Sequence, residues 1–191
     1  VFAHMRYIYE ATLALFGTAG DPLVLWMQPD VTWECGACTS KYPTTVGVNV
    51  FASSIWIAYS TDQAYWSDAV VVHELGHWVM SSYGTSPREG GVHYVGQPTL
   101  PGQAWSEGFA TFFSSLARGN QLYFDKQNGN FFWFDLREMA YASRGMALPT
   151  ADGVGYPYPD DPILQLMDEN VVAAMSYAMA LGSQPAGVTA L

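Results

Sequence analysis

The chain has 191 residues, half of them hydrophobic and 15% aromatic, so it is long enough to bury a core as one domain or as two small lobes. Its 7 Lys and Arg residues stand against 17 Asp and Glu residues, which gives a formal charge of -10 and a pI near 4.5. This charge argues against a nucleic-acid partner, because phosphates would be repelled over most of the surface. No apolar run reaches the roughly 18 residues of a membrane span.

The first residues, Val1 to His4, show neither an initiator Met nor a signal-peptide pattern, so we expect a processed product or an excised domain. Few Lys residues, abundant Trp and Tyr, and the acidic balance favour a secreted or extracytoplasmic enzyme. Cys35 and Cys38 form a lone C-x-x-C pair, which lacks the second pair of a structural zinc ribbon. We expect a small loop-closing disulfide there, with free thiols as the alternative.

The first half of the chain predicts a helix, short strands and a second helix. The expected elements are a helix from His4 to Phe16, a buried strand from Leu23 to Met27, two strands within Val46 to Tyr59 divided at Ser53-Ser54, and a helix from Gln63 or Ser67 to Ser81 that ends near Gly84. A long loop follows, between Tyr83 and Gln103.

The second half predicts mainly helices around an aromatic hairpin. The expected elements are a helix from Ala104 to Ala117, two strands at 122–124 and 131–134 around the turn Asn128-Gly129, a short helix from Asp135 to Ser143, an irregular stretch from Leu148 to Pro162, and a helix from Pro162 to Leu181.

Residues 73–77 carry an H-E-x-x-H pattern inside an apolar run that predicts a helix. Residues four apart on a helix lie about 40° apart around the axis and about 6 Å along it, so His73 and His77 project from one face toward a common zinc ion. Glu74 lies beside this face, where it suits a general base that takes a proton from a metal-activated water. The alternative is a pair of hydrogen-bonded histidines in or near a core.

A catalytic zinc ion generally has three protein ligands and one open position, so a third ligand is needed. A third His six residues after His77 is excluded, because that position is Tyr83. Glu107 is the acid in the apolar helix downstream, where an unpaired carboxylate is costly, and it fits this role. It could instead be a first-turn acid favoured by the helix dipole behind a Ser106 cap. His93 in the long loop could be a third ligand, an oxyanion stabiliser or a solvated residue.

Residues 73–77, together with Trp105-Ser106-Glu107-Gly108-Phe109-Ala110-Thr111, resemble a gluzincin metallopeptidase, the thermolysin-like group in which H-E-x-x-H and a Glu on a following helix bind zinc. The resemblance implies Zn²⁺ as cofactor, His73, His77 and Glu107 as its ligands, and Glu74 as general base. In this group an acid often stands four residues after the ligand Glu and orients the first His. Here that position is Thr111, and an alcohol is a weaker orienter than a carboxylate.

The resemblance also implies an α+β, zincin-like fold with residues 1–191 as a single catalytic domain. A small β-sheet lobe with the zinc helix would occupy residues 1–84, and a mainly helical lobe residues 85–191, around a cleft. An edge strand from Val46 to Tyr59 would pair with an extended peptide or protein substrate. The implied reaction is peptide-bond hydrolysis, with His93, then Tyr94 and Tyr177, as candidates for the group that stabilises the oxyanion.

We therefore expect a zinc endopeptidase, with two alternatives. One is a catalytically inactive, zinc-bearing binding domain, and the other is an amide or ester hydrolase that is not a peptidase. Glu74 favours activity, because a purely structural zinc site has no need of an acid between its His ligands.

Overall fold

The structure is a computed structural model that describes residues 1–27, 37–57, 67–87, 89–91, 93, 97–127, 130–144 and 162–182. The described elements, in chain order, are α1 (Phe2–Phe16), β1 (Leu23–Trp26), β2 (Cys38–Ser40), β3 (Thr44–Val46), β4 (Asn49–Phe51), β5 (Ser53–Trp56), α2 (Asp68–Tyr83), α3 (Pro101–Arg118), β6 (Leu122–Gln127), β7 (Asn130–Asp135), β8 (Ala140–Arg144), α4 (Pro162–Gln165) and α5 (Glu169–Leu181). They form a mixed arrangement of helices and small sheets.

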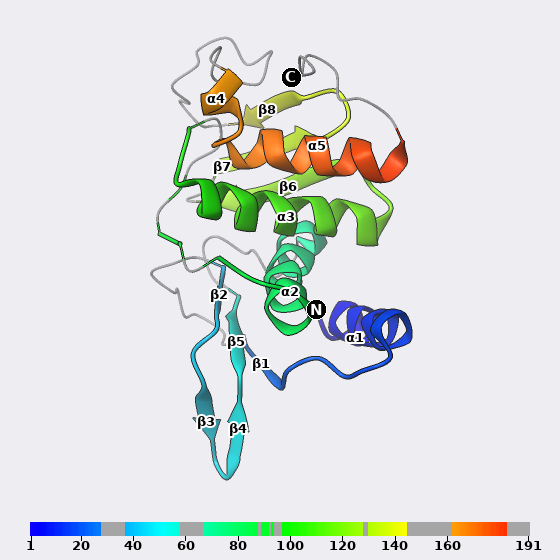
Figure 1. Cartoon of the computed structure of the whole chain (residues 1–191), viewed down its shortest axis with the longest axis vertical. Helices are drawn as coiled ribbons and strands as arrows, with labels where there is room; N and C mark the ends of the chain where they lie inside the picture. The colour runs from blue at the N-terminus through cyan, green and yellow to red at the C-terminus, as the bar shows by residue number, and fades with distance from the viewer. Residues whose placement is uncertain are drawn as a thin grey trace.

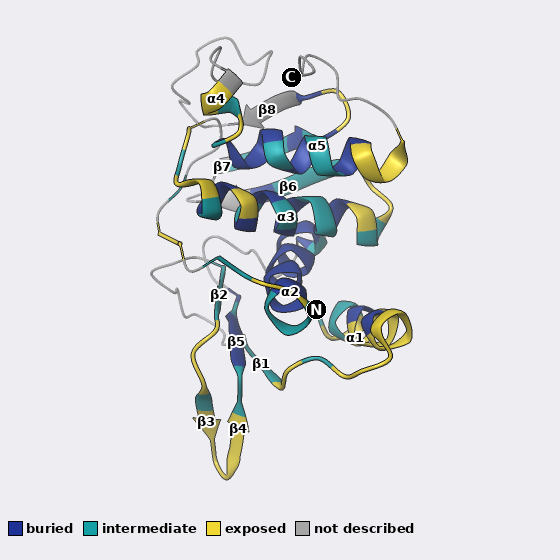
Figure 2. Ribbon diagram, in the orientation of Figure 1, coloured by how far each residue is buried: buried dark blue, intermediate teal, exposed yellow. Residues whose placement is uncertain are grey.

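Helix α2 lies at the centre of this arrangement, between the N-terminal strands and helix α3 (Figure 1). Every residue from Ala69 to Met80 is buried, which explains why so apolar a sequence surrounds the polar trio of the H-E-x-x-H pattern (Figure 2). Ser67 caps the helix by accepting a hydrogen bond from the Val70 amide at 3.3 Å, so the helix begins at the second of its two predicted starts.

A three-stranded sheet packs beside α2, with the strand order β1-β5-β2. Strand β5 pairs in parallel with β1 and antiparallel with β2, so Ile55 lies between Leu25 and Thr39. The first core is built here, from α2 side chains together with buried residues such as Ile8 and Ile55. Because β5 has a partner on each side, β1 and β2 are the outer strands of this sheet, and β2 contacts α2.

The segment from Val46 to Tyr59, predicted as two strands, contains β4 and β5, and β3 precedes it and ends at Val46. Gly47, with φ of +61°, makes the turn between β3 and β4, and β5 begins at Ser53, so the predicted break at Ser53-Ser54 was misplaced. Of the strands in this segment, β5 is the middle strand of the three-stranded sheet and so does not provide the predicted edge there. Strands β3 and β4 form a ribbon that projects from the body (Figure 1), and Val48 at its turn is almost fully exposed.

Helix α3 begins at Pro101, three residues before the predicted start at Ala104. Proline is favoured in the first turn of a helix, because it has no amide hydrogen to leave unpaired there. Glu107 consequently lies beyond the first turn, which contains no acid, and the alternative in which Ser106 caps a first-turn Glu107 is wrong.

The C-terminal part differs from the sequence prediction at two places. Residues predicted as a helix from Asp135 to Ser143 form a turn and strand β8, because β8 pairs along β7 in the sheet β6-β7-β8. The long helix predicted from Pro162 to Leu181 is divided into α4 and α5, because the Asp168 carboxylate accepts hydrogen bonds from the Asn170 and Val171 amides and starts a new helix.

The predicted hairpin is present as β6 and β7, although its turn residues Asn128 and Gly129 lie outside the described residues. The stretch from Leu148 to Pro162, which was expected to be irregular, also lies outside the described residues up to residue 161. Cys38 is disulfide-bonded, as the loop-closing prediction requires, whereas Cys35 lies outside the described residues.

Candidate metal and catalytic site

Helices α2 and α3 come into direct contact where Gly76 faces Ala110. A Cβ on Gly76 would lie 3.0 Å from the Ala110 Cα, so the two backbones touch without intervening side chains. On α2, His73 and His77 lie on either side of this contact along the chain. On α3, Glu107 precedes it by nearly one turn. The close approach therefore brings the three predicted ligands together from two helices.

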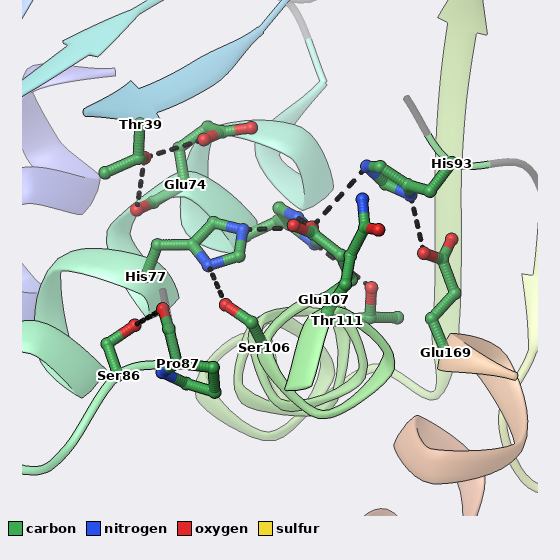
Figure 3. A network of polar contacts seen from close by, with 12 residues as sticks. Thr39, Glu74, His77, Ser86, Pro87, His93, Ser106, Glu107, Thr111 and Glu169 are labelled. Atoms are coloured by element: carbon green, nitrogen blue, oxygen red, sulfur yellow. Dashed lines mark hydrogen bonds and ion pairs between the residues drawn. The ribbon is translucent and has the colours of Figure 1, made fainter. Parts of the chain in front are cut away.

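The three candidate ligands converge on one point (Figure 3). Glu107 Oε2 lies 3.2 Å from His73 Nε2 and 3.0 Å from His77 Nε2, and the three ligand atoms all lie within 4.8 Å of one another. A tetrahedral zinc ion with bonds of about 2.0–2.1 Å holds its ligand atoms about 3.3–3.4 Å apart. The two nitrogens and one oxygen therefore match the donor set and nearly the spacing of a zinc site with one open position.

The Glu107 carboxylate is ionised in this setting. Burial opposes its ionisation, but the neighbouring His77 and His73 hold the pKa of Glu107 well below its ordinary value. An anionic oxygen between two imidazole nitrogens is a donor set that suits a zinc ion. Within the described part of the chain, these residues form the group of His and acidic side chains able to hold a metal ion.

Both imidazoles are held on their far side by hydroxyls of α3. His73 Nδ1 lies 3.0 Å from Thr111 Oγ1, and His77 Nδ1 lies 3.3 Å from Ser106 Oγ. Both hydroxyl side chains are buried. The contacts leave Nε2 of each ring facing the point of convergence.

The Glu74 carboxylate lies beside strand β2, where Thr39 donates a hydrogen bond to its Oε2 at 2.7 Å (Figure 3). Burial raises the pKa of the Glu74 carboxyl to about 7, although His73 and the Thr39 hydrogen bond favour its charged form. A carboxyl whose pKa is near neutrality can both accept and return a proton, which suits general acid-base chemistry.

His93 approaches the ligands from the loop before α3. Its Nε2 lies 3.8 Å from Glu107 Oε2, and its Nδ1 forms an ion pair with Glu169 Oε2 of α5 at 2.5 Å. Burial favours the neutral ring, but Glu169 outweighs it and raises the pKa of His93 to about 9. The imidazole therefore carries a positive charge and lies beside the convergence point.

The loop that carries His93 is tied to the start of α3. Gln103, which is buried, donates from Nε2 to the Gly91 carbonyl at 2.8 Å, and the Gly102 amide donates to Glu89 Oε2 at 2.6 Å. These hydrogen bonds fix the loop two residues before His93. The position of His93 is therefore set by both α3 and α5.

The structure thus brings together His73, His77, Glu107, Glu74 and His93. Of the two other oxyanion candidates, Tyr94 lies outside the described residues, and Tyr177 is buried in a separate hydrophobic cluster that includes residues of α5 and β7. The contacts of three further residues were not foreseen: Thr39, Ser106 as a His77 partner, and Glu169. No local pattern identifies them, because each acts on a residue at least 29 positions away.

A comparison with protein families matches residues 26–155 to the mycolysin C-terminal domain. The chain belongs to the mycolysin C-terminal domain family. The mycolysin family is a family of zinc-dependent peptidases. The match therefore supports the predicted relationship to thermolysin-like proteases, although it does not test the individual site residues. The matched residues include the whole of α2 and α3, and with them the candidate metal and catalytic site. Searches of curated proteins and of solved structures find no match.

Proposed function

We propose that this chain is a zinc-dependent peptidase domain of zincin-like fold, in which His73, His77 and Glu107 bind the metal and Glu74 is the general base. The observation that carries the proposal is the convergence of His73 Nε2, His77 Nε2 and Glu107 Oε2 within 4.8 Å. Glu74, buried one residue along from His73, supports a catalytic rather than a structural role. Membership of a peptidase family supports the same reaction class.

A bound zinc ion would supply Lewis-acid activation of a water molecule and of the scissile carbonyl group. Glu74 takes the proton from that water and later gives it to the leaving amine. Thr39 donates to Oε2 of Glu74, which leaves Oε1 as the oxygen that carries the proton. The elevated pKa of Glu74 suits both steps.

His93 is proposed as the group that stabilises the oxyanion. Its Nε2 lies 3.8 Å from Glu107 Oε2, and its protonated ring offers a hydrogen bond to a developing negative charge. Glu169 keeps Nδ1 occupied, so the donor directed at the substrate is Nε2–H. This is the second of the three roles expected for His93 from the sequence.

The proposed substrate is an extended peptide that lies alongside β2, an outer strand of the described sheet β1-β5-β2. Thr39 of this strand already contacts Glu74, so a peptide paired with β2 would pass beside the base. A secreted location is proposed as well, because mycolysin-family proteins are secreted and a disulfide at Cys38 fits an oxidising environment. No described helix is long and apolar enough to cross a membrane.

The test compares the parent protein with Glu74→Gln and Glu107→Ala. Zinc content is measured by elemental analysis and hydrolysis by release of peptides from a denatured protein. Glu74→Gln is expected to retain zinc and to lose activity by about 10²- to 10⁴-fold. Glu107→Ala is expected to lose zinc and activity together. Glu10→Gln and Glu10→Ala, on the exposed surface of α1, are the matched controls.

Each alternative gives a different result. A parent protein that binds zinc but cleaves no peptide bond supports an inactive binding domain, and cleavage of amide or ester substrates alone supports the non-peptidase hydrolase. Full activity in Glu74→Gln would exclude the proposed base. Zinc retained with unchanged affinity in Glu107→Ala would exclude Glu107 as the third ligand.

A further inference from the structure

We propose that the hydroxyls of Thr111 and Ser106 are the groups that orient the two zinc-binding imidazoles, so that α3 supplies one ligand and both orienting groups without a second carboxylate. The proposal rests on the proposed function, because it concerns the same three ligands. It assigns a role to two residues that bind neither metal nor substrate, and both are therefore positioning residues.

The geometry places one hydroxyl on each ring. Thr111 Oγ1 lies 3.0 Å from His73 Nδ1, and Ser106 Oγ lies 3.3 Å from His77 Nδ1, while both Nε2 atoms face Glu107. Thr111 and Ser106 are 5% and 4% exposed, so bulk water does not compete for either imidazole nitrogen. The two contacts lie on opposite sides of Glu107 along the same helix (Figure 3).

The spacing on α3 explains how one helix serves both rings. Thr111 follows Glu107 by four residues, so it lies one turn further along the face that carries Glu107. Ser106 precedes Glu107 by one residue and reaches the second imidazole from the adjacent face. Because His73 and His77 are also one turn apart on α2, each hydroxyl meets a different ring. The close contact of Gly76 with Ala110 keeps the two helices near enough for both hydrogen bonds.

Hydroxyls have a specific chemical consequence at this position. A ring that binds metal through Nε2 carries its proton on Nδ1 and donates it to the orienting group. A carboxylate would accept that proton with a full negative charge, whereas Thr111 and Ser106 accept it with neutral oxygens. The hydroxyls therefore fix ring orientation and tautomer without adding negative charge beyond that of Glu107.

The experiment measures zinc affinity by competition with a coloured chelator, on the metal-free protein, for Thr111→Val, Ser106→Ala and Thr111→Ser. The first two are expected to weaken zinc binding by about 10- to 100-fold, since loss of an orienting partner typically has this effect. Thr111→Ser keeps a hydroxyl and is expected to retain most of the affinity. Ser115→Ala, a fully buried hydroxyl on the same helix that contacts neither His, is the matched control with unchanged affinity.

A second readout separates orientation from general loss of structure. The visible absorption spectrum of the Co²⁺-loaded protein reports ligand geometry, and it is expected to change in Thr111→Val but not in Ser115→Ala. If Thr111→Val does not fold, Thr111→Asp replaces it. The new carboxylate would orient His73 more strongly than the hydroxyl does, so this variant is expected to bind zinc more tightly than the parent protein. Misfolding cannot produce such a gain in affinity.

The outcomes distinguish this proposal from the one on which it rests. A parent protein that binds no zinc overturns the proposed metal site itself. A parent that binds zinc tightly, with Thr111→Val and Ser106→Ala unchanged in affinity and in Co²⁺ spectrum, overturns only the orienting role of the hydroxyls. Thr111→Asp with affinity equal to that of the parent contradicts the orienting role of Thr111 in the same way.

Discussion

Gly76 on α2 and Ala110 on α3 are in backbone contact, with only 3.0 Å between the position of a Cβ on Gly76 and the Ala110 Cα. Any larger side chain at position 76 must move one helix away from the other. The candidate ligands come from both helices, so this contact sets the distance between the imidazoles of α2 and the carboxylate of α3. It also explains why the H-E-x-x-H pattern carries a glycine directly before its second His.

Gly76→Ala is expected to lower the free energy of unfolding by about 1–3 kcal/mol, even though alanine favours helix more than glycine does, because the added methyl overpacks the contact. The separation of the helices is also expected to weaken zinc binding. Chemical denaturation of the metal-free protein and zinc titration measure the two effects. Gly90→Ala is the control, because a Cβ there meets open space. Unchanged stability and affinity in Gly76→Ala would contradict this account of the contact.

Thr39→Val is expected to lower kcat by about tenfold while leaving zinc content unchanged. The substitution keeps the shape of the side chain but removes the hydrogen bond to Glu74 Oε2, and a bond to a charged group contributes about 1.5–3 kcal/mol. Peptide hydrolysis at saturating substrate measures the change. Thr45→Val, on the exposed face of the β3–β4 ribbon, should behave as the parent. A parental kcat in Thr39→Val would show that Thr39 does not position the base.

His93→Ala is expected to lower kcat by about 10²- to 10³-fold, the effect of removing one donor to an oxyanion. Glu169→Gln should give a smaller loss, because the ring stays in place but loses the anion that favours its protonated form. Zinc content should be parental in both variants, as His93 is not among the proposed ligands. Glu138→Gln, at an exposed position, serves as the control. Loss of zinc in His93→Ala would instead assign His93 to the metal.

Asp168→Ala is expected to lower the free energy of unfolding by about 1–2 kcal/mol, because it removes the side-chain cap of α5. Asp168→Asn keeps a capping group and should retain most of the stability. Urea denaturation of the metal-free protein distinguishes the two. Asp21→Ala, whose side chain is exposed, is the comparison variant. Equal losses in Asp168→Ala and Asp168→Asn would show that the carboxylate acts through something other than the cap.

Removal of zinc is expected to lower Tm, because a ligand that binds only the folded protein stabilises it. At a free zinc concentration of about 1,000 times Kd the stabilisation is about 4 kcal/mol. Thermal denaturation of the parent with and without a chelator measures the difference. Glu107→Ala should show the same Tm in both conditions. A zinc-dependent shift of parental size in that variant would place the metal elsewhere in the protein.

The sequence by itself predicted which residues would come together as candidate ligands and base. The helical spacing of His73 and His77 is local, so their convergence follows from the backbone geometry of one turn, and the pattern around Glu107 marks it as the candidate third ligand. It also predicted most of the helices and strands, because apolar periodicity, glycines and prolines act within a few residues. It misplaced elements where a local signal was outweighed, as at β8, which is held by pairing with β7, and at Asp168, whose cap divides a long apolar segment.

Only the tertiary structure decided which side chains act on these residues. Thr39 contacts Glu74, which is 35 positions away in the sequence, and Glu169 contacts His93 over an even larger sequence separation. Such contacts depend on how helices and strands pack, and packing depends on the fit of surfaces distant in sequence, which no periodicity records. From the sequence, Ser106 was a candidate helix cap, and Thr111 occupied the position where thermolysin-like proteases often have an acid. The packing of α3 against α2 places each hydroxyl on a different imidazole, because Gly76 allows the two backbones to touch.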